Sequence, residues 1–504
     1  MDRQFSSSDM EKASVHNIEE VALHGHAATD IKDGRALFVV DEAAERALRR
    51  KIDLRILPTV ALLYLFCFID RANIGNARLA GLEKDLKLKG YDYNILLTAF
   101  YVAYVVFEFP AQVVNKWIGP GKMIPILSFM FGLCSLCMAF VHTFGQAIAV
   151  RFLLGIAEGG VFPGIAFFLS RFYRKDELGF RLACYIVCAP LAGAVGGLLA
   201  SGILKIDSIG PYRTWRNIFL VEGIITMGIA IISWFILPDR PEVCKWLTPE
   251  ERQLAEARIK SENVGQTEVV DSLQTKTLLA GVFNATTLIS STIFFFDNIV
   301  VQGVGFLCPT IIRTIYPGLT TVEQQLRTVP PYVVGAFTTL LTGYLSFKTK
   351  KRGLYMVLSA PFMILGYAMY LATQDPHVRY TAAFMVAIGA FSFGALCTAW
   401  AAANVTSDTA RAGALGTVVF FGNCGGLVST WTFLPNAAPR YVPGNAFNLC
   451  GSSVMLILAA GLWAWQVREN RAKANGRDDW RIEGKTQAEI EALGQKLPGF
   501  RYSY

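Results

Sequence analysis

Residues 56–78 read ILPTVALLYLFCFIDRANIGNAR. The first fourteen are almost entirely apolar, and the adjacent charges of Asp70 and Arg71 follow them. A helix of about 20 predominantly apolar residues spans the roughly 30 Å hydrocarbon core of a bilayer. The stretch therefore predicts a membrane-spanning helix, and the two charges inside it need a specific explanation.

The composition of the whole chain supports the same class. Of 504 residues, 53% are hydrophobic and only 17% are charged, whereas about a quarter of a soluble domain is charged. The 44 glycines and 35 phenylalanines are typical of packed membrane helices. These values argue against a soluble enzyme, a nucleic-acid binder and a disulfide-stapled secreted domain, and they predict an integral membrane protein.

The net charge of +8 does not indicate nucleic acid as a partner. Lys and Arg are spread through short loops and the flanks of the apolar stretches, where anionic lipid accounts for them. Cys134 and Cys137 form a C-x-x-C without a second pair or a nearby His, so we expect small apolar residues there rather than a metal site. No nucleotide-binding G-x-x-x-x-G-K-[ST] occurs, which excludes an ATP-driven pump. We expect the lipid bilayer as a partner, and no cofactor.

Apolar stretches long enough to cross the membrane recur twelve times, or eleven if the interrupted stretch at 278–312 is misread. They lie near 56–78, 93–115, 122–142, 145–170, 180–205, 215–237, 278–312, 329–347, 353–373, 380–404, 412–434 and 447–467. The sequence thus predicts an all-α integral membrane protein with twelve transmembrane helices in two six-helix halves, the arrangement of many secondary transporters.

Polar stretches divide the chain into five parts. We expect a disordered cytoplasmic tail at 1–45, an N-terminal six-helix half at 46–237, a cytoplasmic linker at 238–277, a C-terminal half at 278–467 and a cytoplasmic tail at 468–504. Basic residues are equally frequent in the short loops of the two sides, so the flanks decide the orientation. Because Arg46, Arg49, Arg50, Lys51 and Arg55 precede the first span, and Arg468, Arg471 and Lys473 follow the last, we expect both termini in the cytoplasm.

Charged residues within the spans are the candidates for function. A charge at the bilayer centre costs at least about 2.5–3.5 kcal/mol, so each one needs a partner or a role. The first half contains most of them, and the second half has one carboxylate with two uncharged polar groups. They are Asp70, Arg71, Glu108, Arg151, Glu158 and Glu222, and then Asp297, Asn404 and Asn423.

Helix geometry predicts that some of these charges meet. Asp70 lies about 20 Å from the inner start of its span, and Arg151 falls at a similar depth in an antiparallel span. Arg151 and Glu158 are two turns apart and share one helix face. We expect Arg151 to neutralise Asp70, Glu158 or each in turn, as a proton switch requires. The alternative is a static ion pair that fixes helix packing.

The remaining carboxylates have weaker cases. For Glu108, which precedes Pro110, a structural role is at least as well supported as proton coupling. Glu222 lies close to Arg216 in the sequence, and a simple ion pair is the expectation. Asp297 is a second site or a polar lining residue.

If Arg151 serves the carboxylates, Arg71 remains as an uncompensated cation, which selects an anion and suits a carboxylate. Tyr101, Tyr104 and Trp400 are candidates to stack on a planar substrate ring, with helix packing as the alternative. Asn404 and Asn423 complete the predicted substrate-binding set.

Two motifs carry a family resemblance. Residues 68–77, FIDRANIGNA, and residues 151–164, RFLLGIAEGGVFPG, resemble the first-span and fourth-span signatures of the anion:cation symporter branch of the major facilitator superfamily. Residues 400–404, 423–426 and 438–445 are similar to the fungal allantoate, pantothenate and nicotinate permease group, and residues 425–434 to nicotinate permeases. The resemblance covers about 50–470. It implies proton-coupled symport by alternating access, with proton-carrying carboxylates at Asp70 and Glu158, the substrate carboxylate on Arg71, and Arg151 exchanging between the acids.

The chain departs from that pattern at two places. Phe68 stands where sugar-acid members carry a tyrosine, which argues against a polyhydroxy substrate. The loop at 115–122, NKWIGPGK, lacks the aspartate usual in the superfamily, so gating there has to depend on other contacts.

The sequence therefore predicts a monomeric plasma-membrane transporter that imports a small organic monocarboxylate, nicotinate-like first, together with protons. Alternatives are another carboxylate such as allantoate, pantothenate or a biotin-like acid, an exporter or exchanger without proton coupling, and a non-transporting nutrient sensor. No nucleophile–base arrangement or metal cluster supports an enzyme.

Overall fold

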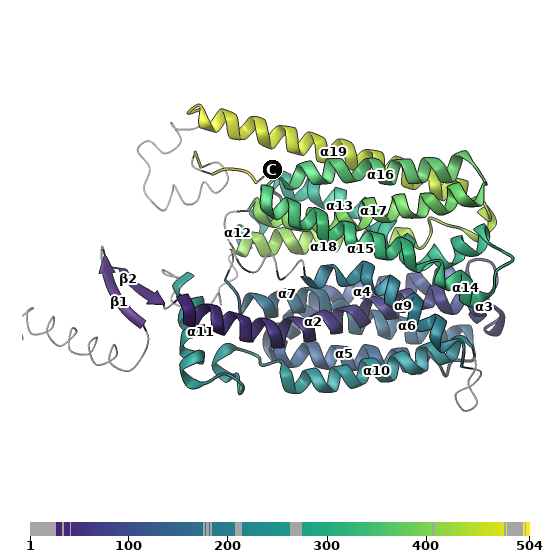
Figure 1. Ribbon diagram of the computed structural model, residues 1–504, viewed down its shortest axis with the longest axis horizontal. Helices are drawn as coiled ribbons and strands as arrows, with labels where there is room; N and C mark the ends of the chain where they lie inside the picture. Colours follow the sequence, from purple (N-terminus) through teal and green to yellow (C-terminus); the bar gives the residue numbers. More distant parts are fainter. Residues whose placement is uncertain are drawn as a thin grey trace, which may run out of the picture.

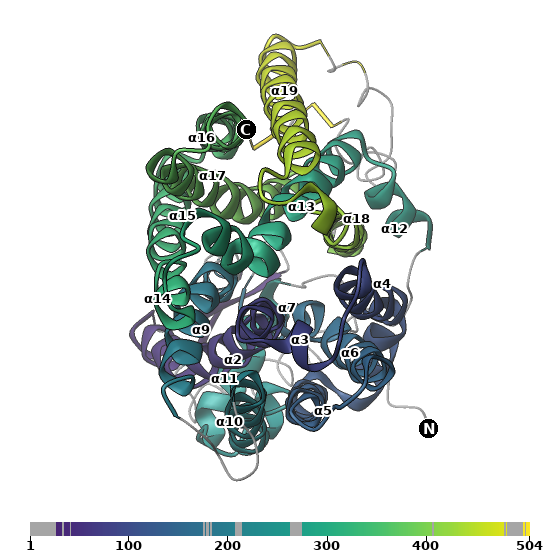
Figure 2. The ribbon, with the colours of Figure 1, turned by 90° about the vertical axis from the view of Figure 1, so that its right-hand side faces the viewer.

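The computed structural model describes residues 27–32, 35–40, 42–174, 177, 181, 184–206, 214–262, 275–405, 408–477, 480, 497–498 and 500–503. Long helices run roughly parallel to one another in two groups that lie side by side (Figure 1). Seen along the helices, α2 to α10 occupy one side and α12 to α19 the other (Figure 2). These two groups are the predicted N-terminal and C-terminal halves.

The N-terminal half is built from six membrane spans. These are α2 (Glu42–Leu79), α4 (Asp92–Ile118), α5 (Pro120–Met138), α6 (Phe144–Gly159) continued by α7 (Val161–Ser170), α9 (Cys188–Ile203) and α10 (Trp215–Ile236), with the short α3 (Leu82–Asp85) after α2. The division between α6 and α7 falls close to Pro163, which has no N–H to donate to the carbonyl of Gly159.

The C-terminal half repeats the plan. Its spans are α13 (Ala285–Ile315), α15 (Val329–Thr349), α16 (Arg352–Ala372), α17 (Pro376–Ala403), α18 (Asp408–Ser429) and α19 (Val442–Ala474), with the short α12 (Thr275–Val282), α14 (Thr321–Leu326) and η2 (Pro435–Ala437). The connection between the halves contains η1 (Pro241–Val243) and α11 (Pro249–Glu262).

The twelve-helix prediction is confirmed. Within the described residues, ten helical stretches are long and apolar enough to span a membrane, and α18 contributes the shorter apolar stretch Gly413–Ser429. The 21-residue α15 completes the set. The seventh span begins at Ala285 rather than at 278, because the side chain of Asn284 accepts a hydrogen bond from the backbone N–H of Thr286 at 2.9 Å and caps a new helix.

The predicted tail at 1–45 differs from the structure at its C-terminal part. Strands β1 (Ala27–Lys32) and β2 (Arg35–Val40) pair antiparallel, with Ala27 opposite Val40. They lie outside the bundle, near the start of α2 (Figure 1). Asp-Gly, a common two-residue hairpin connection, occupies positions 33 and 34 of the sequence. The rest of the predicted tail before residue 42 lies outside the described residues.

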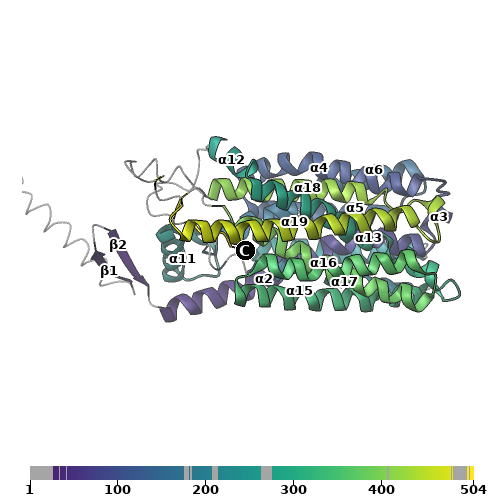
Figure 3. The same ribbon diagram turned by 90° about the horizontal axis from the view of Figure 1, so that it is seen from above.

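We name the two ends of the bundle by their helices. The terminal face holds the start of α2, the linker helix α11 and the end of α19, and the opposite face holds α3 and α14 (Figures 1 and 3). Hydrogen bonds join the two halves at the opposite face: Asn94 Nδ2 donates to the carbonyl of Thr430 at 2.5 Å, and Trp431 Nε1 donates to Thr98 Oγ1 at 2.9 Å. The structure is therefore a state in which the halves are joined at this end.

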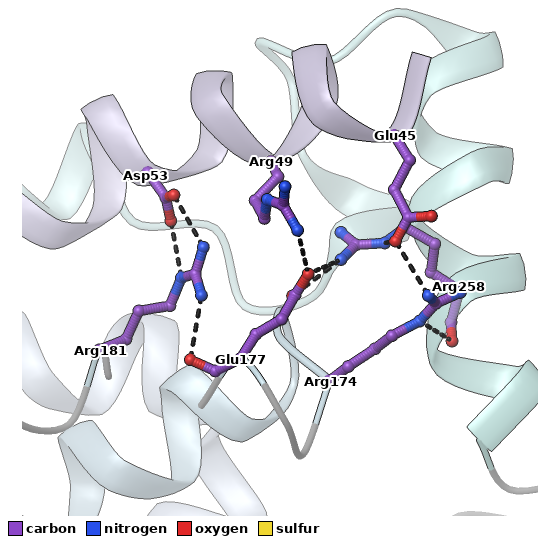
Figure 4. Close-up of polar contacts among 7 residues, drawn as sticks. All are labelled: Glu45, Arg49, Asp53, Arg174, Glu177, Arg181 and Arg258. Atoms are coloured by element: carbon purple, nitrogen blue, oxygen red, sulfur yellow. Dashed lines mark hydrogen bonds and ion pairs between the residues drawn. The ribbon is translucent and has the colours of Figure 1, made fainter. Parts of the chain in front are cut away.

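A network of charged side chains fastens the linker to the N-terminal half (Figure 4). Arg258 of α11 is 1% exposed, and it donates to Glu45 of α2 and to Glu177 of the connection between α7 and α9, both at 2.8 Å. Arg49 of α2 also reaches Glu177, at 2.9 Å. Arg181 binds both carboxylate oxygens of Asp53 at 2.8 Å. The predicted linker thus contains a helix docked on α2.

The loop that departs from the family pattern finds its carboxylate elsewhere in the chain. Asp239, directly after α10, accepts a hydrogen bond from the backbone N–H of Gly121 at 3.3 Å and pairs with Arg171 at 3.2 Å. A Cβ at Gly121 would lie only 2.6 Å from the backbone of Asp239. The close approach therefore requires glycine, and the aspartate missing from the loop is supplied from the end of the sixth span.

Replacing Arg258 with Met tests whether the network stabilises the fold. Glu45 and Glu177 each lose a charged donor in a largely buried position, so we expect the free energy of unfolding to fall by about 2–3 kcal/mol. The apparent melting temperature of the purified protein in detergent measures this change. Arg240→Met is the control, because the Arg240 side chain is 63% exposed and its loss should cost below about 0.5 kcal/mol. Equal losses in both variants would contradict the role given to Arg258.

The same network predicts a pH dependence. Burial raises the pKa of Glu177, but hydrogen bonds and charge from Arg49 and Arg258 outweigh it and hold the pKa below its usual 4.5. A carboxylate with a lowered pKa stabilises the fold above its usual pKa, and the contribution is lost as the pH falls through the lowered value. Glu177→Gln should therefore lower the melting temperature at neutral pH, and the difference from wild type should shrink below pH 4.5. Glu250→Gln, at an exposed position of α11, is the control; a pH-independent difference for Glu177→Gln would refute the assignment.

Candidate functional site

Arg71 and Glu158 form a buried ion pair in the middle of the N-terminal half. Arg71 of α2 is 5% exposed and Glu158 of α6 is fully buried. Arg71 Nε donates to Glu158 Oε2 at 2.5 Å, and the Cys67 thiol reaches the same oxygen at 3.4 Å. Glu158 Oε1 has no hydrogen-bond partner among the described residues. One carboxylate oxygen is thus shared by two donors, while the other is left open.

Asp70 and Arg151 lie beside this pair without joining it. Asp70 Oδ1 accepts a hydrogen bond from Ser135 of α5 at 2.6 Å, and Oδ2 has no partner in the described part of the chain. Arg151 is 2% exposed, its guanidinium lies 5.6 Å from the ring centre of Phe219, and its Nε and Nη2 have no described hydrogen-bond partner. Arg151 lies within electrostatic range of both Asp70 and Glu158.

The predicted quartet is therefore brought together, but with different pairing. We expected Arg151 to neutralise the carboxylates and Arg71 to be left over. In the structure Arg71 holds Glu158, and Arg151 keeps unsatisfied donors. The reason is side-chain reach: α2 directs Arg71 toward Glu158, whereas Arg151, two turns away on α6, is held over Phe219.

Arg71 also borders a cavity between the two halves. Its guanidinium lies 4.9, 5.5 and 4.7 Å from the ring centres of Phe68, Phe100 and Tyr104. The empty space there amounts to about 340 Å³ when the part open to solvent is included. Helices of both halves contribute to it, and its lining consists of Phe68, Arg71, Ala72, Ala189, Gly193, Val301, Gln302, Gly305, Phe306, Tyr332 and Phe391.

The two predicted tyrosines of α4 take different places. Tyr104 packs against the Arg71 guanidinium. Tyr101 is fully buried at the boundary between the halves, where its ring lies 5.8 Å from that of Phe306 and fills the space above Gly426. Tyr104 therefore belongs to the surroundings of Arg71, whereas Tyr101 serves the contact between α4 and the C-terminal half.

Glu108 and Asn423 were not predicted to pair, and in the structure they bind each other across the two halves. Asn423 Nδ2 of α18 donates to Glu108 Oε2 of α4 at 2.8 Å, and both side chains are buried. A polar bond at this position joins the two halves deep in the bundle.

Asp297 lies in the C-terminal half. It is 1% exposed, and neither carboxylate oxygen has a hydrogen-bond partner among the described residues. Its Oδ2 lies only 2.5 Å from where a Cβ of Gly394 would be, so this glycine makes room for it. Its electrostatic neighbours Tyr367 and Cys397 also belong to the C-terminal half.

Trp400 and Asn404 are placed away from the cavity, and the substrate role predicted for them is not supported by their position. Trp400 Nε1 donates to the carbonyl of Ser503 at 2.8 Å. Asn404 binds the backbone of Ser503 twice, at 2.9 and 2.8 Å. Asn470 binds the backbone of Tyr502 in the same two-bond manner, both at 2.8 Å. These side chains hold residues 502 and 503 against the ends of α17 and α19.

Sequence reasoning missed Ser135, Cys67 and Gln302. Ser135 lies inside the C-x-x-C stretch that we read as helix packing, and a single serine in an apolar span gives no signal of its own. Cys67 precedes Arg71 by one turn, so its contact follows from helix spacing once Glu158 is placed. Gln302 is a buried amide in an apolar span. The search of the spans for charged side chains would have found it if every uncharged amide had been included.

Comparisons with known proteins place this geometry in a family. The sequence profile of the Major Facilitator Superfamily matches residues 60–430. The high-affinity nicotinic acid transporter of Saccharomyces cerevisiae is 30% identical over 505 residues, covering 99% of this chain and 93% of that protein. The major facilitator-type transporter hxnP of Emericella nidulans is 31% identical over 97% of this chain and 99% of its own length.

Solved structures agree on the fold. A bacterial homolog of the human lysosomal transporter Spinster, in an inward-facing and occupied conformation, superposes with a TM-score of 0.60 at 15% identity, covering 81% of this chain and 96% of its own.

An uncharacterized transporter of Schizosaccharomyces pombe is a further sequence relative, 32% identical over 99% of both chains. With twelve spans in two halves and a matching profile over most of its length, this chain belongs to the Major Facilitator Superfamily of transporters.

Proposed function

We propose that the protein imports a small organic monocarboxylate together with protons by alternating access. The observation that carries the proposal is the buried pair of Arg71 and Glu158 at the edge of a cavity between the two halves. A guanidinium matches the fork of a carboxylate. Glu158 occupies the position on Arg71 that a substrate carboxylate would take.

The exchange on Arg71 accounts for proton coupling. If a substrate anion displaces an ionised Glu158, that carboxylate is left unpaired in a buried position, which is strongly unfavourable. Protonation of Glu158 removes the cost, because the neutral acid can release Arg71. Substrate binding and proton uptake are therefore linked at one side chain.

Asp70 and Arg151 allow the proton to move between two acids of the site. Arg151 has unsatisfied donors within electrostatic range of both acids, so it can stabilise whichever carboxylate is ionised. Movement of the proton between Asp70 and Glu158 then changes which acid Arg151 neutralises, and no buried charge is left alone.

Alternating access requires the contacts between the halves to break in turn. The bonds of Asn94 with Thr430 and of Thr98 with Trp431 close the opposite face in this state. We infer that they separate when the cavity opens on that side, and that the terminal face, with its basic flanks, is cytoplasmic. We place the protein in the plasma membrane as a monomer.

The choice of substrate follows from the surroundings of Arg71. Phe68, Phe100 and Tyr104 pack around its guanidinium, which favours an aromatic or otherwise apolar acid over a polyhydroxy acid. The similarity to a nicotinic acid transporter supports nicotinate as the first substrate to test. Allantoate, pantothenate and biotin-like acids are the alternatives within the same mechanism.

Uptake of radiolabelled nicotinate into cells that express the chain tests the function. We expect faster uptake at about pH 5 than at about pH 7.5, because Glu158 and Asp70 must take up protons. Asp70→Asn and Glu158→Gln should each reduce proton-driven uptake at least about tenfold while retaining exchange across the membrane. Gln374→Leu, at an exposed position between α16 and α17, is the control. Uptake that is indifferent to pH and to both variants would refute proton coupling.

Arg71→Lys tests the recognition of the carboxylate. Lysine keeps the charge and loses the two-pronged geometry, so we expect the apparent KM for nicotinate to rise about 10- to 100-fold, as loss of a charge-assisted bond predicts. Arg78→Lys, which keeps a charge at the end of the same helix, should leave KM unchanged. If pH-dependent uptake is found for allantoate or pantothenate but not for nicotinate, the mechanism stands and the substrate choice is wrong.

A further inference from the structure

Glu222 of α10 is a buried carboxylate with no role in the proposed site around Arg71 and Glu158. The sequence suggested a pair with Arg216. In the structure Arg216 binds Asp85 of α3 and also donates to the carbonyl of Val141 at 2.8 Å. Glu222 is therefore left without the partner expected for it, and this prediction was wrong. The reason is that Arg216 begins the helix and points to the opposite face, whereas Glu222, nearly two turns further on, points into the bundle.

Both oxygens of Glu222 are isolated from donors. The residue is 0% exposed, and neither Oε1 nor Oε2 has a hydrogen-bond partner among the described residues. The helix packing is tight at this level: a Cβ at Gly223 would lie 2.6 Å from the backbone N of Leu136 in α5. An ionised carboxylate in such a place would be strongly unfavourable.

Asp70 of α2 lies within electrostatic range of Glu222, and Asp70 itself lies within electrostatic range of Glu158 of α6 and of the Cys134 thiol of α5. Asp70 lies about 14 Å from the end of α2, and Glu222 lies about 11 Å from the start of α10, counted from the same face of the bundle. The two carboxylates thus share one level. From α5, Ser135 already donates to Asp70, and from α6, Arg151 lies over Phe219, one turn from Glu222 on α10. The described part of α9 contains no Asp, Glu, Lys or Arg.

The buried carboxylates of the N-terminal half outnumber its buried arginines, and this supports a proton held near Glu222. Among the side chains that the structure describes, the spans of the N-terminal half contain four buried carboxylates and two buried arginines, Arg71 and Arg151. Arg71 is taken by Glu158 and Glu108 is bound by an amide. Arg151 lies within electrostatic range of Asp70, whereas the electrostatic neighbour of Glu222 is the carboxylate of Asp70. Two neighbouring buried carboxylates with one cation near only one of them favour a state in which the two together keep one proton.

We propose that Glu222 and Asp70 form a carboxylate pair that binds and shares a transported proton behind the Arg71–Glu158 site. The proton moves from the carboxylic acid of one residue to the carboxylate of the other, and no other bond changes. The inference rests on the proposed proton-coupled transport and adds a proton-binding residue to it. Ser135 and Arg151 position Asp70, while Glu222 is the second acceptor.

Infrared spectroscopy of the purified full chain, titrated with pH in detergent, tests the pair without needing a substrate. The C=O stretching bands of buried carboxylic acids report their protonation, and the band lost in Glu222→Gln or in Asp70→Asn identifies each residue. Coupled carboxylates lose their protons in two separated steps. In Asp70→Asn the Glu222 step should move to lower pH by about one unit, because the negative charge of Asp70 no longer opposes the ionisation of Glu222.

Controls make the outcome decisive. Thr226→Val removes another buried, unpartnered side chain one turn along the same helix, and it should leave both steps where they are in wild type. A Glu222 step that does not move in Asp70→Asn overturns the pair. If Asp70→Asn does not fold, Glu222→Gln tests the pair instead: the later of the two wild-type steps should disappear, and a later step that remains overturns the pair.

The pair and the transport function fail in distinguishable ways. Coupled titration steps together with nicotinate uptake that ignores pH would retain the pair and refute proton-driven import. Uptake that rises at low pH, together with uncoupled steps, would retain the function and remove Glu222 from it.

Discussion

The rest of the account depends on the buried ion pair between Arg71 and Glu158, because a buried charge is strongly unfavourable without an opposite charge beside it. Glu158 occupies Arg71 in the structure, and both side chains are removed from water. Neither partner can leave without a replacement charge or a proton. In the proposed mechanism a substrate anion is the replacement at Arg71, and a proton is the replacement at Glu158. Competition for one side chain would then couple the two without a distant signal between two sites.

The two halves have different tasks around this constraint. The N-terminal half contains most of the buried charge, and the linker helix is fastened to it through Arg258 and Glu177. The C-terminal half contributes the cavity wall, with Gln302 and Tyr332, and closes the opposite face through Thr430. Such a division suits two bodies that rock against each other around a fixed site.

The sequence predicted the helices well, since a long run of apolar residues has to cross the bilayer whichever helices it packs against. It also predicted which side chains matter, because a charge inside a span is energetically costly whichever side of its helix it lies on. It did not predict the partners. Glu158 is bound by Arg71 rather than by Arg151, and Arg216 binds Asp85 instead of Glu222. Trp400 and Asn404 bind the backbone near the C-terminus. Each of these choices depends on helix rotation and side-chain reach, which spacing along one helix does not determine.

The most direct test of the central claim is the number of protons taken up when nicotinate binds to the purified protein. Isothermal titration calorimetry at neutral pH, in two buffers with different heats of ionisation, gives this number. If the anion replaces Glu158 on Arg71, about one proton should be taken up per nicotinate bound, and the uptake should disappear in Glu158→Gln. Binding without proton uptake in the wild-type protein would contradict the claim that substrate and proton meet at this ion pair.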